Sequence, residues 1–125
     1  MTPKKGTVMD KSAIAKIVFD YIKSKGGVSL VEVENIFSEN GFDYTGDCML
    51  ATSAPNIIMW ADWNAEAVAI LKEVIDMGAE FSCSSILIYL YDGKMLNIPI
   101  AKSAKGYKKE LHWLPVVLNV NSDTH

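Results

Sequence analysis

The lysines near the C-terminal end of this chain are spaced so that they can bind phosphate. Lys102, Lys105, Lys108 and Lys109 lie within eight residues, and Tyr107 stands among them. Ammonium groups attract phosphate oxygens, and an aromatic ring between them can stack on a base. The same groups can hold an acidic surface of a partner protein. The alternative is a solvated loop whose lysines keep an edge strand from pairing with other chains.

Large aromatic residues are the second group, and their chemistry is molecular recognition. Three tryptophans in 125 residues supply a large share of the buried area, so at least two are expected in the core. A tryptophan or tyrosine that stays exposed concentrates binding energy at an interface. The candidate interface residues are Trp63, Trp113, Tyr89 and Tyr91.

Patterns for catalysis or metal binding are missing from the sequence. His112 follows Glu110 by two residues, but no nucleophile or second histidine is near it in sequence. Cys48 and Cys83 have His112 and His125 as soft partners, which is a poor set for zinc. The carboxylates form no HExxH, GxSxG or phosphate-loop pattern. We therefore expect no catalytic residue, no metal, no cofactor and no small-molecule substrate.

The charge balance disfavours nucleic acid as a partner. Twelve basic against 15 acidic residues give a net charge of −3, whereas a dedicated nucleic-acid-binding domain is usually basic. All the basic residues are lysines, so the chain lacks the arginine fork that commonly reads guanine.

Nothing in the sequence predicts a membrane segment or a signal peptide. The longest strongly apolar run, residues 86 to 90, is far shorter than the roughly 20 residues of a membrane helix. The lysines near the N-terminus are not followed by the apolar stretch of a signal peptide. We therefore expect a cytoplasmic protein.

Apolar spacing and capping residues predict three helices. Residues 11 to 25 repeat apolar side chains at intervals of three and four. A second helix begins at the capping box formed by Ser29 and Glu32. A third helix, residues 65 to 77, follows Asn64 as its N-terminal cap and presents an acidic outer face.

Strands are predicted around and after the third helix. Residues 57 to 60 are typical of a short buried strand. Residues 81 to 100 alternate in polarity around an Asp-Gly pair, which predicts an antiparallel hairpin with a type I′ turn. A last strand is expected within residues 111 to 120. Because Pro115 lacks an amide donor, that strand must lie at a sheet edge or begin after the proline.

The order helix, short extended piece, helix, helix and hairpin, over residues 11 to 100, resembles the winged-helix architecture of three helices closed by a small sheet. The resemblance rests on element order alone. It implies either DNA binding, through the third helix and the hairpin loop, or protein interaction.

Three features depart from the DNA-binding pattern. The second and third helices are about 23 residues apart, far more than in a helix-turn-helix, and the hairpin turn is short. The third helix presents Glu66, Glu73 and Asp76 against Lys72, which repels phosphates.

Together these patterns predict an α+β fold, with a winged-helix-like core of three helices and a small antiparallel sheet made by the hairpin 81 to 100 and a C-terminal strand. Residues 1 to 10 are expected to form a flexible arm, residues 11 to 120 a single domain, and residues 121 to 125 a frayed tail. The predicted function is that of a small regulatory or adaptor domain that binds protein, with self-association as one form of that binding. The alternative is a DNA-binding regulator that contacts phosphates through residues 102 to 109.

Overall fold

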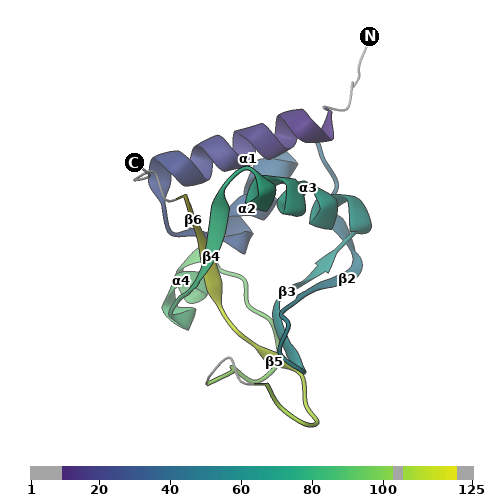
Figure 1. The fold of residues 1–125 in the computed structure, drawn as a ribbon, viewed down its shortest axis with the longest axis vertical. Helices are drawn as coiled ribbons and strands as arrows, with labels where there is room; N and C mark the ends of the chain where they lie inside the picture. Colours follow the sequence, from purple (N-terminus) through teal and green to yellow (C-terminus); the bar gives the residue numbers. More distant parts are fainter. Residues whose placement is uncertain (1–9, 103–105, 121–125) are drawn as a thin grey trace.

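The computed structural model describes residues 10–102 and 106–120, and its elements divide between helices and two small sheets (Figure 1). The predicted α+β class is confirmed. The elements follow one another as α1 (Lys11–Lys25), β1 (Val28–Ser29), α2 (Leu30–Glu39), β2 (Thr45–Ala51), β3 (Ile57–Trp63), α3 (Ala65–Asp76), β4 (Ala79–Cys83), α4 (Ile86–Asp92), β5 (His112–Trp113) and β6 (Val116–Val120).

The three helices predicted from the sequence are present as α1, α2 and α3. The capping box at the start of α2 is formed as expected. Ser29 Oγ accepts a hydrogen bond from the Glu32 amide at 3.2 Å, and Glu32 Oε2 accepts one from the Ser29 amide at 3.2 Å. Asn64 Oδ1 caps α3 by accepting from the Ala67 amide at 2.8 Å. In each case a side-chain oxygen satisfies an amide that the helix itself leaves without a partner.

The strands form two three-stranded sheets that meet along one stretch of chain. β6 is the central strand of the first sheet, with β1 and β4 antiparallel on either side. In the second sheet β3 lies between antiparallel β2 and parallel β5. Only Leu114 and Pro115 separate β5 from β6. The Leu114 amide donates to the Ile58 carbonyl at 2.9 Å, and the Ser84 amide donates to the Pro115 carbonyl at 3.0 Å. The two residues between β5 and β6 are therefore hydrogen-bonded to β3 and to the residue after β4.

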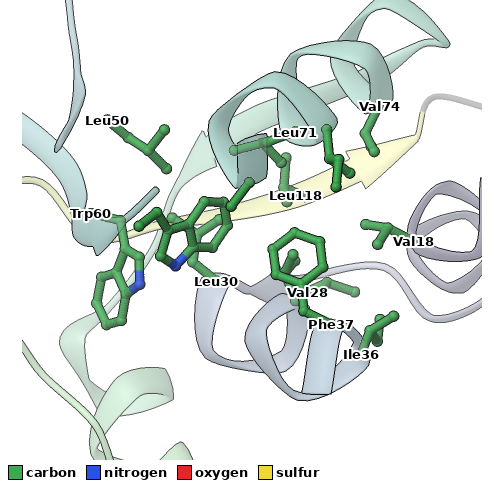
Figure 2. Packing of buried hydrophobic residues seen from close by; sticks show 14 of the residues in the cluster. Val18, Val28, Leu30, Ile36, Phe37, Leu50, Trp60, Leu71, Val74 and Leu118 are labelled. Atoms are coloured by element: carbon green, nitrogen blue, oxygen red, sulfur yellow. The ribbon is translucent and has the colours of Figure 1, made fainter. Parts of the chain in front are cut away.

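The core fills the space between α1, α2, α3 and the strands (Figure 2). Phe37 of α2 packs edge-on against Trp63, with ring centroids 5.3 Å apart. Trp60, Tyr89 and Trp113 form a second aromatic group, with centroid distances of 5.0 to 5.7 Å. Buried aromatic pairs add about 1 kcal/mol to the effect of the area they remove from water. These two groups therefore join α2 and α4 to the second sheet.

The predicted hairpin over residues 81 to 100 is wrong, because residues 86 to 92 form the helix α4. Ser85 caps this helix by accepting a hydrogen bond from the Leu87 amide at 3.1 Å. Gly93 ends it with a φ of 86°, in the left-handed region. A glycine with positive φ suits the end of a helix as well as a type I′ turn, so the Asp-Gly pair fits both structures.

The second strand of that hairpin is reduced to a bridge between Ile100 and Trp113. The last predicted strand is present as β5 and β6, and β6 begins after Pro115, one of the two expected arrangements. It is the central strand of its sheet and not an edge. The predicted N-terminal arm, apart from Asp10 at the cap position of α1, and the predicted tail lie outside the described residues.

Candidate functional site

The segment between β4 and β5 presents apolar side chains that no other described part of the chain covers. Within α4, whose seven residues are all described, Tyr89 is buried. In contrast Leu87 is 66% exposed, Leu90 53% and Tyr91 91%. Contiguous apolar surface of this kind on a soluble protein commonly marks a binding site. We call the following five exposed residues the α4 surface: Leu87, Ile88, Leu90, Tyr91 and Met95.

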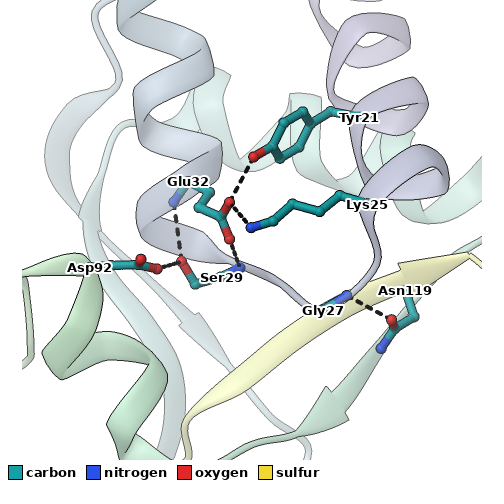
Figure 3. A network of polar contacts seen from close by, with 7 residues as sticks. All are labelled: Tyr21, Lys25, Gly27, Ser29, Glu32, Asp92 and Asn119. Carbon is teal, nitrogen blue, oxygen red and sulfur yellow. Dashed lines mark hydrogen bonds and ion pairs between the residues drawn. The ribbon is translucent and has the colours of Figure 1, made fainter.

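The same segment turns its charges toward α2. Residues 84 to 101 contain two charged residues, Asp92 and Lys94. Asp92 Oδ2 accepts a hydrogen bond from Ser29 Oγ at 2.5 Å (Figure 3). Lys94 Nζ donates to Glu34 Oε1 at 2.7 Å. The outward positions of the segment are therefore apolar or uncharged.

Tyr89 fixes the inner side of α4 to the core. Its hydroxyl donates to the Val116 carbonyl at 2.6 Å and accepts from the Leu30 amide at 3.1 Å. Burial raises the pKa of the Tyr89 hydroxyl well above its ordinary value. The hydroxyl therefore stays protonated and keeps α4 bonded both to β6 and to the first turn of α2.

Glu34 is a buried carboxylate that holds the residue after α4. Its side chain is 3% exposed. Its Oε2 accepts hydrogen bonds from the indole nitrogens of Trp60 at 2.7 Å and Trp63 at 2.8 Å, and its Oε1 accepts from Lys94. A buried charge destabilises a fold unless it is paired and hydrogen-bonded. Three donors meet that condition here and join α2 to β3 and to the C-terminal end of α4.

Lys94 remains charged in this position. Burial works against the ammonium, but its hydrogen bond to Glu34 and the charge of that carboxylate outweigh burial and raise the pKa of Lys94 above its ordinary value. The ammonium also lies 5.6 Å from the centre of the Tyr44 ring and 5.9 Å from that of Trp60. Aromatic faces at this distance attract a cation. Lys94 therefore keeps its proton and its hydrogen bond to Glu34.

A second polar network lies beside α4 and joins α1 to α2 (Figure 3). Glu32 Oε1 accepts hydrogen bonds from the Tyr21 hydroxyl at 2.7 Å and from Lys25. Burial of Glu32 favours its neutral form, but the hydrogen bonds from Lys25, Tyr21 and the Ser29 amide outweigh burial and lower the pKa of Glu32. The charges next to α4 are thus paired with each other.

Two hollows flank α4. One, of about 280 Å³, lies between the helix and the Glu32 network, and Leu87, Ile88 and Tyr91 line its α4 side. The other, of about 460 Å³, is lined by Leu90, Gly93, Met95, Leu96 and Asn97. Leu87 and Tyr91, four residues apart on α4, line the first hollow, which the charged side chains of Lys25, Glu32 and Asp92 also line. No charged residue lines the second hollow, so it can receive an apolar side chain.

Most of the predicted interface residues have a core role instead. Trp63, Trp113 and Tyr89 are fully buried, so they present no surface to a partner. Trp63 and Trp113 lie on strands whose inner face packs against the helices, and both indole nitrogens are bonded within the chain. Tyr91 is the predicted interface residue that is exposed.

The predicted lysine segment is only partly described, because Lys105 lies outside the described residues. Lys102, Lys108 and Lys109 are exposed. Tyr107 does not project as a free ring. It stacks on His112, with centroids 3.6 Å apart and planes 8° from parallel, and its hydroxyl accepts from the Lys102 amide at 2.9 Å.

The turn between β2 and β3 holds this segment in place. Asn56 Nδ2 donates to the Tyr107 carbonyl at 2.9 Å, and the Tyr107 amide donates to the Pro55 carbonyl at 3.0 Å. His112 Nδ1 donates to the Glu110 carbonyl at 2.8 Å, since a carbonyl can only accept. Within the described residues no carboxylate pairs with this imidazole.

Metal ligands are not grouped in residues 10–102 and 106–120, where no three His, Cys, Asp or Glu side chains come together to hold an ion. In the same residues no helix combines the length and the apolar character needed to cross a bilayer.

Neither Glu34 nor the α4 surface is predicted from the sequence. The signal for Glu34 was present, because Leu30, Val33, Glu34 and Phe37 share one stripe at helical spacing. A glutamate on an apolar stripe indicates a buried carboxylate that needs donors, and tryptophan nitrogens can supply them. The sequence carries no comparable signal for the α4 surface, because a short apolar run is equally consistent with a helix and with a strand.

The comparisons add no relatives from which a function could be taken. No family model matches this chain, and comparison with curated proteins and with solved structures finds no match.

Proposed function

We propose that this protein is a small cytoplasmic, non-catalytic interaction module, with a regulatory or adaptor role, that binds protein through the α4 surface. The observation that carries the proposal is a helix whose outward side chains are apolar and whose neighbouring charges point inward. Water solvates such a surface poorly, and burying it against a partner is favourable by about 25 cal/mol per Å². The free cysteines Cys48 and Cys83 agree with a reducing compartment.

The winged-helix resemblance fits this role as part of the same proposal. α1, α2 and α3 are followed by a small antiparallel sheet of β1, β6 and β4. The segment between β4 and β6, where a winged-helix domain carries its wing, here contains α4. An apolar helix in the place of a wing favours contact with protein over contact with the DNA backbone, because phosphates bind cations and not aliphatic side chains.

Site-specific photo-crosslinking tests the proposal. The photoreactive residue p-benzoylphenylalanine is placed at Tyr91 in the full chain, in the cells that make the protein. As a matched control it is placed at Met49 on β2, which is also exposed but lies away from the α4 surface. We expect a discrete protein adduct from position 91, which Leu90→Lys suppresses, and none from position 49. Equal adducts at both positions, or none at either, would contradict the proposal.

The second candidate is a DNA-binding regulator, and the exposed lysines Lys102, Lys108 and Lys109 favour it. Within the described part of the chain none of them forms an ion pair, so they are available to phosphates. The carboxylates of α3 oppose this function. Glu66 and Asp76 are exposed on the helix that would have to approach the DNA, and Glu66 pairs with Lys11 at 3.1 Å.

Fluorescence anisotropy with random duplex DNA at low salt separates the two candidates. The interaction module is expected to leave the anisotropy unchanged. A DNA-binding regulator would raise it, with a salt dependence that weakens when Lys102, Lys108 and Lys109 are replaced by alanine. That second result would favour the DNA-binding function.

A further inference from the structure

We infer that this protein binds a small amphipathic carboxylate, of the class of medium-chain fatty acids, in a pocket beside α3. The inference goes beyond the proposed function and does not depend on it. The pocket has a volume of about 280 Å³. β2 contributes residues 49 to 51 to its walls, β3 contributes Met59, α3 contributes Leu71 and its neighbours, and β4 contributes Phe81. We call it the α3 pocket.

The lining of the α3 pocket suits an alkyl chain. Apart from Lys72, every residue that lines it is apolar. Leu50 and Leu71 are 8% and 3% exposed, whereas Met49 is 52% exposed, so the wall runs from the surface to the core. Methionine side chains are unbranched and flexible, so Met49 and Met59 can adapt to the chain that enters. Burying an aliphatic chain here removes apolar area from water on both sides.

Lys72 sets the chemistry of the head group. It lines the pocket and is exposed, so its apolar stem can lie along the wall while the ammonium stays in water. Within residues 10–102 and 106–120 no carboxylate forms an ion pair with it, whereas ion pairs engage Lys11, Lys16, Lys25 and Lys94. An ammonium without a carboxylate partner, at an apolar pocket, is complementary to an anion that carries an alkyl chain.

Other classes of small molecule match the α3 pocket less well. A cationic amphiphile would place its charge next to Lys72. A sugar or a nucleotide needs several polar partners to orient it, and Lys72 is the one charged or polar side chain among the described residues that line the pocket. A single carboxylate on an aliphatic chain needs one cation and an apolar wall, and the pocket offers both.

Nuclear magnetic resonance of the full chain with isotope-labelled methionine methyl groups tests this inference, with octanoate as the probe. Met49 and Met59 line the α3 pocket, whereas Met95 lines a hollow beside α4. We expect octanoate to shift the Met49 and Met59 signals saturably, with a dissociation constant below about 1 mM, and to leave Met95 unchanged. Octylammonium has the same chain and the opposite charge, and we expect it to bind at least about threefold more weakly.

A matched pair of variants isolates the charge of Lys72. Lys23 on α1 is also exposed and forms no ion pair within the described part of the chain. Lys72→Gln and Lys23→Gln therefore remove the same charge from two exposed sites, one of them away from the pocket. We expect the dissociation constant of octanoate to rise at least about threefold in Lys72→Gln and to stay unchanged in Lys23→Gln. Circular dichroism checks that both variants fold.

Several results would overturn the inference. They are unchanged Met49 and Met59 signals at several millimolar octanoate, shifts confined to Met95, octylammonium binding as tight as octanoate binding, and equal octanoate affinities in Lys72→Gln and the wild type. An equal loss in both variants would also overturn it, because the effect would then come from net charge. The crosslink at position 91 tests the proposed function separately, so either proposal can fail while the other holds.

Discussion

At the scale of single residues, Glu34 joins α2 to β3 and to the residues that follow α4. Its two carboxylate oxygens receive hydrogen bonds from Trp60 and Trp63 of β3 and from Lys94, which follows α4. Because the carboxylate is buried, these bonds form in an environment of low dielectric constant, where leaving a donor unpaired is costly. Glu34 thus specifies the orientation of both indoles.

Replacing Glu34 tests this role. We expect Glu34→Leu to lower the free energy of unfolding by about 3 kcal/mol, because two indole N–H groups and an ammonium lose their acceptor. Glu34→Gln keeps one oxygen for the indoles and loses the ion pair, so we expect a smaller loss of about 1 to 2 kcal/mol. Urea unfolding followed by tryptophan fluorescence measures both. A Glu34→Leu variant as stable as the wild type would show that the cluster is dispensable.

The Tyr89 hydroxyl gives a second residue-scale prediction. Tyr89→Phe leaves the Val116 carbonyl and the Leu30 amide without their side-chain partner while the ring still packs. We expect a loss of about 2 kcal/mol in the free energy of unfolding. Tyr91→Phe removes the same atom from an exposed ring and is expected to change stability by less than about 0.5 kcal/mol. Equal effects of the two substitutions would refute the bridging role of Tyr89.

At the scale of elements, the start of α2 is expected to respond to pH through Glu32. Its pKa is lower in the folded chain than in the unfolded chain. Its charged form therefore stabilises the fold above the unfolded pKa of about 4.3, and this contribution is lost as the pH falls through the folded pKa.

Glu32→Gln isolates that charge, because glutamine can still complete the capping box. We expect the variant to be less stable than the wild type by up to about 1 kcal/mol at pH 7. The difference in the free energy of unfolding should shrink as the pH falls from about 6 to about 3. Urea titrations at several pH values measure it. A difference that is constant with pH would mean that the charge of Glu32 does not contribute.

The elements also show how far the sequence predicts this fold. α1, α2 and α3 follow from apolar spacing and caps, because these helices bury one stripe and each signal is local. α4 does not follow, because Ile86 to Tyr91 is apolar on every side and has no stripe. Its helical form depends on the cap at Ser85, on Gly93 in the left-handed conformation and on the burial of Tyr89 in the core. Ser85 and Gly93 can be seen in the sequence, but both are equally consistent with a hairpin.

The candidate site was even less accessible to sequence reasoning. The α4 surface depends on which apolar residues remain outside after the chain folds, and this is a tertiary property. An exposed tryptophan would have marked an interface. Trp60, Trp63 and Trp113 are all buried instead, because they belong to the two aromatic groups of the core. Of the four predicted interface residues, Tyr91 is the one that is exposed, and it belongs to the α4 surface.

At the scale of the whole molecule, the exposed lysines and the exposed apolar side chains lie in two separate segments of the chain. The exposed lysines Lys102, Lys108 and Lys109 follow the bridge at Ile100, whereas the α4 surface precedes it. α4 itself lies at the periphery of the molecule (Figure 1). A partner that covered α4 would leave α1 and α3 exposed, so the proposed binding requires no rearrangement of the core.

Hydrogen–deuterium exchange of the full chain, alone and in the complex isolated through the crosslink at position 91, tests the central claim most directly, namely that another protein chain covers the α4 surface. We expect amides in residues 86 to 96 to exchange more slowly in the complex than in the chain alone, while those of β2 keep the same rate, because partner binding protects the segment that it buries. Unchanged exchange in residues 86 to 96 on formation of the complex, or protection that appears on β2 and α3 instead, would contradict this claim.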